Sequence, residues 1–142
     1  MTLVTDKGFS PDDWMHGFTP FAELAANDAS LQVAVDVASD TDPAVLAGRL
    51  AGIALIRIDF PSFADGRGFT IAARLRRMGY GGRLRAKGHV IADQYAMARR
   101  AGFDEVEIGE DLAARQPEDQ WLRRADWRAH DYRARLRARP FN

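Results

Sequence analysis

The sequence alternates short apolar stretches with longer amphipathic ones, and this alternation restricts the possible folds more than any other feature. Most of the short stretches are rich in β-branched residues and stop close to Gly, Pro, Ser or Asp, which is typical of strands, whereas the stretch at 83–88 is polar and has no β-branched residue. They predict strands at residues 31–37, 53–60, 83–88 and 103–109. The longer stretches predict helices at residues 39–52, 68–79, 90–102 and 118–139. The last predicted strand alternates apolar and acidic residues, which suits the edge of a sheet.

Strands that alternate with helices along a chain form parallel sheets, joined by right-handed helical crossovers. We therefore predict an α/β fold with about four βα units. Two arrangements satisfy this order: an open three-layer sheet, or a sheet that resembles half of a TIM barrel. A length of 142 residues suits a single domain over the whole chain, 1–142. Its first part, 1–29, reads as an irregular arm with one short helix at 20–28, and 118–139 as a basic amphipathic helix.

Composition excludes several classes of site. The chain has no cysteine, which excludes disulfides, a thiolate nucleophile and cysteine-ligated metal centres. Its three histidines have no ligand spacing, so we expect no metal, and no dinucleotide or flavin motif is present, so we expect no bound cofactor. No apolar run is long enough to span a bilayer and the first residues do not resemble a signal peptide, so we expect a cytoplasmic protein without membrane contact. We expect no nucleic-acid partner either, because the net charge is zero and no recognition motif is present.

The best candidate site is the loop Asp65-Gly66-Arg67-Gly68, between a predicted strand and a predicted helix. Free N–H groups and the dipole at a helix N-terminus favour an anion. The two glycines would let a ligand approach the backbone, and Arg67 offers a planar donor to sulfate, sulfite, phosphate or carboxylate. Asp65 would cap the helix or orient Arg67. The alternative is that the glycines only shape a turn and Arg67 is solvated, because the spacing is neither that of a P-loop nor that of a dinucleotide-binding loop.

A second group of residues would reach the same edge of the sheet. Arg85, Lys87 and Gly88 belong to the next predicted strand, and we expect them to join the anion site. Asp59, at the end of the preceding strand, and Asp93, at the start of the following helix, are candidates for acid–base work. The residues do not identify a catalytic group beyond these candidates.

The stretches "FPSFADGRGFTIAARLR", "GYGGRLRAKGHVIADQ" and "RRAGFDEVEI" resemble the bacterial domain-of-unknown-function 934 family over about residues 30–108. The matching positions are Phe60, Pro61, Phe63, Asp65, Gly66, Arg67, Gly68, Arg85, Gly88, Asp93, Gln94, Gly102 and Phe103. Members of that family carry the label of oxidoreductases of sulfite reduction, a label that follows their gene neighbourhood. The resemblance offers no established catalytic residues.

The resemblance implies a role in sulfur assimilation. The first hypothesis is an accessory protein of assimilatory sulfite reduction, which docks on sulfite reductase or its electron donor and holds an oxyanion. The absence of cysteines and of a dinucleotide motif argues against the reductase itself. The alternative is a small enzyme acting on a phosphate- or sulfate-bearing metabolite, and a third is an interaction module without a ligand. The basic helix at 118–139 would be the docking surface. The sequence is also compatible with a homo-oligomer.

Overall fold

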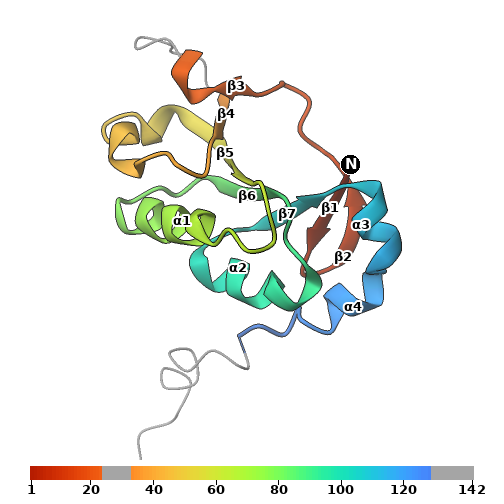
Figure 1. The fold of residues 1–142 in the computed structure, drawn as a ribbon. Helices are drawn as coiled ribbons and strands as arrows, with labels where there is room; N and C mark the ends of the chain where they lie inside the picture. The colour runs from red at the N-terminus through yellow and green to blue at the C-terminus, as the bar shows by residue number, and fades with distance from the viewer. Residues whose placement is uncertain (24–32, 129–142) are drawn as a thin grey trace, which may run out of the picture.

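The computed structural model describes residues 1–23 and 33–128, which form one seven-stranded sheet with helices packed against it (Figure 1). The strands are β1 (Thr2–Thr5), β2 (Gly8–Pro11), β3 (Thr19–Pro20), β4 (Val33–Val37), β5 (Ile53–Phe60), β6 (Arg83–Gly88) and β7 (Glu105–Ile108). The α-helices are α1 (Arg67–Arg77), α2 (Tyr95–Ala101), α3 (Glu110–Arg115) and α4 (Glu118–Leu122). Short 3-10 helices are η1 (Phe21–Glu23), η2 (Pro43–Leu46), η3 (Leu50–Gly52) and η4 (Ala92–Gln94). No helix within the described ranges is long and apolar enough to pass through a bilayer.

The strands follow the order β2-β1-β7-β6-β5-β4-β3 across the sheet. Strands β3 to β7 are parallel and stand side by side in chain order. β1 is antiparallel to both β7 and β2, so the N-terminal hairpin extends the sheet beyond β7. The carboxyl ends of the parallel strands therefore lie along one edge of the sheet, where parallel folds usually place their ligands.

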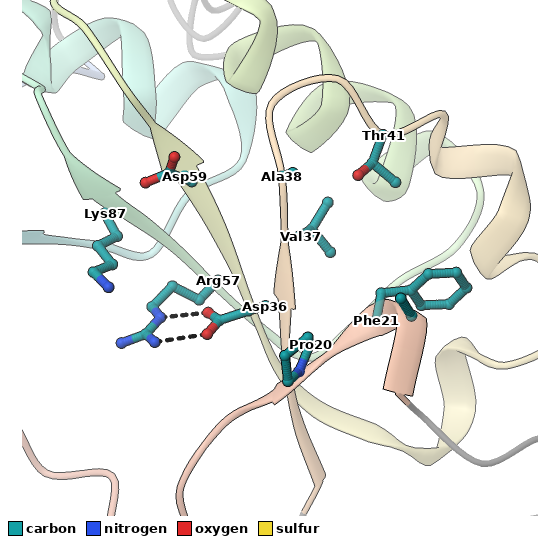
Figure 2. Close-up of a pocket in the computed structure, with 10 residues that line it drawn as sticks. Pro20, Phe21, Asp36, Val37, Ala38, Thr41, Arg57, Asp59 and Lys87 are labelled. Carbon is teal, nitrogen blue, oxygen red and sulfur yellow. Dashed lines mark hydrogen bonds and ion pairs between the residues drawn. The ribbon is translucent and has the colours of Figure 1, made fainter.

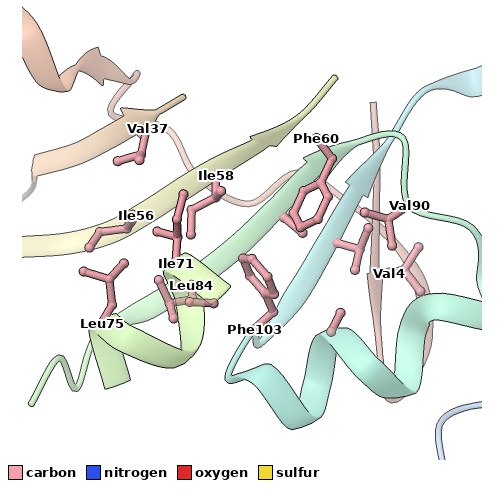
Figure 3. Close-up of a cluster of buried hydrophobic side chains, with 14 of the residues drawn as sticks. Val4, Val37, Ile56, Ile58, Phe60, Ile71, Leu75, Leu84, Val90 and Phe103 are labelled. Atoms are coloured by element: carbon pink, nitrogen blue, oxygen red, sulfur yellow. The ribbon is translucent and has the colours of Figure 1, made fainter. Parts of the chain in front are cut away.

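One face of the sheet carries the hydrophobic core, because successive side chains of a strand point to opposite faces. In β5, Ile56, Ile58 and Phe60 are buried on this face (Figure 3). Helix α1 contributes Ile71 and Leu75, which lie one turn apart and so share a side of the helix. The apolar side of α1 thus packs against β5, and this contact positions the loop that precedes α1 over the end of β5.

The opposite face of the sheet is charged. It carries Arg57 of β5, Arg85 of β6, and Glu105 and Glu107 of β7. Arg85, Glu105 and Glu107 are only 0, 5 and 2 % exposed. Buried charges of this kind are tolerated only when they are paired and hydrogen-bonded, which is the case here.

The segment 12–18 lies over this charged face. An Oδ2 atom of Asp12 is 3.2 Å from Nη1 of Arg85. The ring of Phe18 stacks on Arg57, with its centroid 3.5 Å from the guanidinium carbon. Among the residues that the structure describes, this segment, and not a second layer of helices, therefore covers this side of the sheet.

The structure confirms the α/β class and most of the predicted parallel strands. β5 and β6 have the predicted bounds, and β7 lies inside the predicted strand at 103–109. β4 forms the described part of the strand predicted at 31–37. The helix predicted at 68–79 is α1, and the helix predicted at 90–102 is η4 followed by α2.

The prediction of an irregular N-terminus is wrong for residues 2–11. They form the β1–β2 hairpin, whose turn ends at Gly8 with a φ of 106°. Because β1 pairs with β7, the prediction of an edge position for 103–109 is also wrong. The acidic residues of β7 face Arg57 and Arg85 instead of solvent.

The helix predicted at 39–52 is absent, and two 3-10 helices, η2 and η3, take its place. Asp42 caps η2 through a hydrogen bond from the N–H of Ala44, and Pro43 follows it. Gly48 then adopts a φ of 82°, a left-handed conformation that ends a helix. The local capping of η2 and the left-handed Gly48 thus prevent the continuous helix that the longer periodic pattern predicted.

The C-terminal region also differs from its prediction. Residues 110–115 form α3, which was not expected. The helix predicted at 118–139 ends at Leu122, as α4, and residues 123–128 form turns. The rest of that predicted helix lies outside the described residues, as does most of the helix predicted at 20–28, of which η1 is described.

Candidate functional site

A pocket of about 410 Å³ opens at the carboxyl ends of β4, β5 and β6, on the charged side of the sheet (Figure 2). Its volume is in the range of pockets that hold small organic ligands. It is lined by Pro20, Phe21, Ala22, Asp36, Val37, Ala38, Thr41, Arg57, Asp59 and Lys87. The four charged residues of the lining come from three neighbouring strands, and the other lining residues are apolar except for Thr41.

Arg57 and Asp36 form a fixed pair at the base of this pocket. Residues Asp36 and Arg57 are direct neighbours on β4 and β5. Nε and Nη2 of Arg57 donate to the two carboxylate oxygens of Asp36 at 2.6 and 2.8 Å, and Nη1 donates to Glu107 at 3.2 Å. Burial lowers the pKa of Arg57, but the hydrogen bonds and charges of Asp36 and Glu107 outweigh it and hold the pKa above its usual value. Arg57 is therefore a permanent cation whose charge is largely compensated.

Asp59 and Lys87 are the uncommitted charges of the pocket. They stand opposite each other on β5 and β6, and both side chains point to the charged face. Within the described residues, neither side chain makes an ion pair or a hydrogen bond. Both are accessible at the pocket, so a ligand can reach an ammonium and a carboxylate at once.

The loop Asp65–Gly68 lies at the N-terminus of α1, as predicted, but its arginine already has partners. Arg67 donates through Nε and Nη2 to Asp65 at 3.0 and 2.8 Å, and through Nη2 to the hydroxyl of Ser39 at 3.0 Å. The Arg67 guanidinium lowers the pKa of Asp65 to about 2. Arg67 lines a separate pocket of about 370 Å³ together with Asp40, Asp42 and Arg74, among others. An anion would have to compete there with a carboxylate that is part of the same loop.

The two glycines of this loop have different structural roles. A Cβ at Gly68 would run into the ring of Phe60, so glycine is required for α1 to pack closely on β5. A Cβ at Gly66 would meet nothing closer than 3.9 Å. Gly68, which the sequence suggested as part of a ligand-binding loop, thus allows the close contact between α1 and β5.

Arg85 does not join the anion site that the sequence suggested. Its Nε donates to Glu105 at 2.6 Å and its Nη1 to Glu107 at 2.8 Å, inside the charged layer. Burial lowers the pKa of Arg85, but Asp12 and the two glutamates raise it above the usual value. Only Nη2 of Arg85 lacks a hydrogen bond, and Asp13 lies 3.7 Å from it. Arg85 therefore holds strands together and is out of reach of a ligand.

Gly88 and Asp93 also lie outside the two pockets. Gly88 has a φ of 110°, and a Cβ there would be 2.8 Å from the carbonyl oxygen of Phe60, so this glycine is a turn requirement. Asp93 forms an ion pair with Arg124 at 2.5 Å, next to α4. Of the two predicted acid–base candidates, Asp59 lines one of these two pockets and Asp93 lines neither.

Sequence reasoning missed Arg57 as a site residue. A signal was present, because Arg57 is the only basic residue in the predicted strand at 53–60 and Asp36 the only acidic one in the strand at 31–37. Charges inside two consecutive apolar strands indicate a pair that shares a face, provided that the register is known. The sequence did not supply that register.

The described residues contain no group of three or more side chains suited to hold a metal ion. A family model with the description "Bacterial protein of unknown function (DUF934)" matches residues 34–140 of the chain. The match includes the charged residues of the pocket but begins after Pro20 and Phe21. The search of curated proteins returned no match. The search of solved structures returned none either.

Proposed function

Because the chain belongs to the DUF934 family, we propose that it is an accessory protein of assimilatory sulfite reduction that binds a small ligand through an anionic group. The label that the family carries supports this pathway, and we infer from the pathway a location in the bacterial cytoplasm. The chain has no cysteine, so it cannot bind the iron–sulfur cluster of a reductase through thiolates. An accessory role beside the reductase or its electron donor is consistent with both points.

The observation that carries the binding proposal is the position of Lys87. Its side chain lines the larger pocket without a partner among the described residues, while the cation next to it, Arg57, is held by Asp36. An ammonium group at a pocket mouth is a ready donor to a sulfonate, phosphate or carboxylate group. We therefore place the anion at Lys87 and not at Arg67, which Asp65 already neutralises.

We also infer that the sheet is arranged as half of a TIM barrel and not as an open three-layer sheet. Five parallel strands stand in chain order, and in residues 1–23 and 33–128 the core with α1 and α2 lies on one face only. A doubly wound sheet would need helices on both faces. In barrel-like folds the ligand site lies at the carboxyl ends of the strands, which is where Lys87 is found.

Docking on the reductase or on its electron donor is the second half of the proposal. Support for docking comes from the basic composition of the chain after Trp121, which suits an acidic partner. Of these basic residues, the structure describes Arg123, Arg124 and Arg128. Such a complex should weaken as salt is added, since surface charges are screened. Co-purification with the reductase at low salt, lost at high salt, is the expected result.

Growth of a deletion strain tests the pathway. The strain should grow on sulfide but fail on sulfite and sulfate, and the wild-type gene should restore growth. A Lys87→Gln gene should restore it poorly, while Lys7→Gln, the matched change of the only other lysine, should restore it fully. Normal growth of the deletion strain on all three sulfur sources would refute the role in sulfite reduction.

A second function, a small enzyme acting on a phosphate- or sulfate-bearing metabolite, draws support from Asp59. A free carboxylate opposite the anion-binding lysine is placed to accept a proton from a bound substrate. In that case Asp59→Asn would bind the metabolite but fail to restore growth. Full restoration by Asp59→Asn would exclude this role for the residue.

A further inference from the structure

The charges that line the larger pocket are balanced, and this balance restricts the ligand. The lining contains two cations, Arg57 and Lys87, and two carboxylates, Asp36 and Asp59. Arg57 and Asp36 bind each other through two hydrogen bonds. One positive and one negative group therefore remain for a ligand, and they belong to neighbouring strands.

The geometry brings these two groups close together. Asp59 and Lys87 are register partners on parallel strands, whose spacing is about 4.8 Å. A free oxyanion bound at Lys87 would leave the Asp59 carboxylate beside a like charge. A simple amine bound at Asp59 would leave the Lys87 ammonium beside a like charge in the same way. A molecule with an anionic and a cationic group attached to the same carbon atom would satisfy both side chains at once.

Most of the remaining pocket lining is apolar. Pro20 lies beside Asp36, and Phe21 and Ala38 lie farther from Lys87 and Arg57 (Figure 2). These residues cannot contribute charge, but they offer a surface to a hydrocarbon group. Thr41 adds one hydroxyl at the rim. The pocket thus combines one ion-binding end with an apolar wall.

We propose that this pocket binds a small zwitterion of the α-amino-acid type, with its carboxylate on Lys87, its ammonium on Asp59 and an apolar side chain against Phe21 and Pro20. The inference rests on the proposed function for its anionic half, since Lys87 is the same anion site. It adds the cationic half and the chemical class of the ligand. No other charged group of the pocket is needed, because Arg57 and Asp36 remain paired.

Isothermal titration calorimetry of the full chain with four probes tests the inference. The probes are L-leucine, isocaproate, isoamylamine and sulfite. Compared with leucine, isocaproate lacks the ammonium group and isoamylamine lacks the carboxylate group. Leucine should bind about tenfold or more tightly than any of the other three probes. Asp59→Asn should weaken leucine by about tenfold and leave isocaproate unchanged or tighter. Lys87→Gln should weaken leucine and isocaproate alike. Lys7→Gln and Asp111→Asn, exposed changes of the same kinds, should alter neither.

The outcomes separate the inference from the proposed function. If isocaproate or sulfite binds as tightly as leucine and Asp59→Asn has no effect on leucine, the zwitterion is refuted, while anion binding at Lys87 stands. If leucine binds but Lys87→Gln has no effect, both the zwitterion and the anion site are refuted. If none of the four probes binds the wild type at about 10 mM, a very weak affinity, the pocket is not a site of this class. The growth test on sulfur sources decides the pathway independently of all three results.

Discussion

Replacing Arg85 by methionine tests whether the charged layer of the sheet is a structural element. The guanidinium donates to Glu105 at 2.6 Å, to Glu107 at 2.8 Å and to Asp12 at 3.2 Å, and the residue has no exposed surface. Methionine keeps much of the length and apolar volume of the side chain but removes the charge and the donors. The substitution therefore isolates the ion pairs from the packing.

The expected loss follows from what the substitution leaves behind. Glu105 and Glu107 remain buried, and each keeps one arginine: Arg83 for Glu105 and Arg57 for Glu107. Removing one partner of a buried ion pair costs about 3–5 kcal/mol, because the other charge stays out of water. Since one partner remains for each glutamate, we expect the lower end, a loss of about 3 kcal/mol in the free energy of unfolding.

Urea unfolding, followed by fluorescence and circular dichroism, measures this loss. Lys87→Met is the matched control, because Lys87 stands on the same strand and the same face but makes no ion pair in the described structure. The control should change the free energy of unfolding by less than about 1 kcal/mol. The two variants should share the same slope of stability against urea, since both keep the fold.

The pH dependence gives a second measure. In Arg85→Met, a buried carboxyl that has lost one of its two arginines can relieve its charge by taking up a proton. The difference in stability between the variant and the wild type should therefore shrink as the pH is lowered from about 7 to about 5. A loss no greater than that of Lys87→Met, or a loss that does not change with pH, would refute the argument that Arg85 compensates buried glutamates.

Two further predictions concern the loop before α1. Gly68→Ala should lower the free energy of unfolding by about 1–3 kcal/mol in urea titrations, because the new methyl group overlaps the ring of Phe60. Gly66→Ala is the control, since a methyl group has room there, and it should lower the free energy of unfolding by less than about 1 kcal/mol. Equal effects of the two substitutions would contradict the packing role of Gly68. The carboxyl-carbon NMR signal of Asp65 should titrate with a pKa of about 2, and Arg67→Ala should return that pKa to near 3.9. Because the pKa of Asp65 is lower in the folded than in the unfolded protein, its contact with Arg67 stabilises the fold above about pH 4, and this stabilisation is lost as the pH falls toward 2. An unchanged titration of Asp65 in Arg67→Ala would show that Arg67 does not cause the low pKa.

The sequence predicted the central strands well because their signal is local. The runs at 53–60 and 83–88 are bounded by Pro61, Gly82 and Gly88, and they coincide with β5 and β6. It failed for the N-terminal hairpin, whose strands have four residues each and are too short to show a period. β1 is held in place by β7, about a hundred residues away in the chain, and no local pattern reports such a pairing.

The candidate site was predicted in part. Reasoning from strand ends identified Asp59 and Lys87 at the edge where the pocket lies. It also grouped Arg85 with them, since Arg85 and Lys87 share a face of one strand. The prediction could not see that segment 12–18 covers Arg85 and leaves Lys87 open.

From the order of apolar and polar residues alone, the chain is determined to be an α/β protein with parallel strands and with charges at their carboxyl ends. That information is local, because periodicity and capping act within a few residues. Which charges are neutralised and which are free was decided only by the tertiary structure. Ion pairing depends on distances of a few ångströms between residues far apart in sequence: Asp36 finds Arg57, and Asp65 finds Arg67 and Ser39. Lys87 and Asp59 are left facing the pocket.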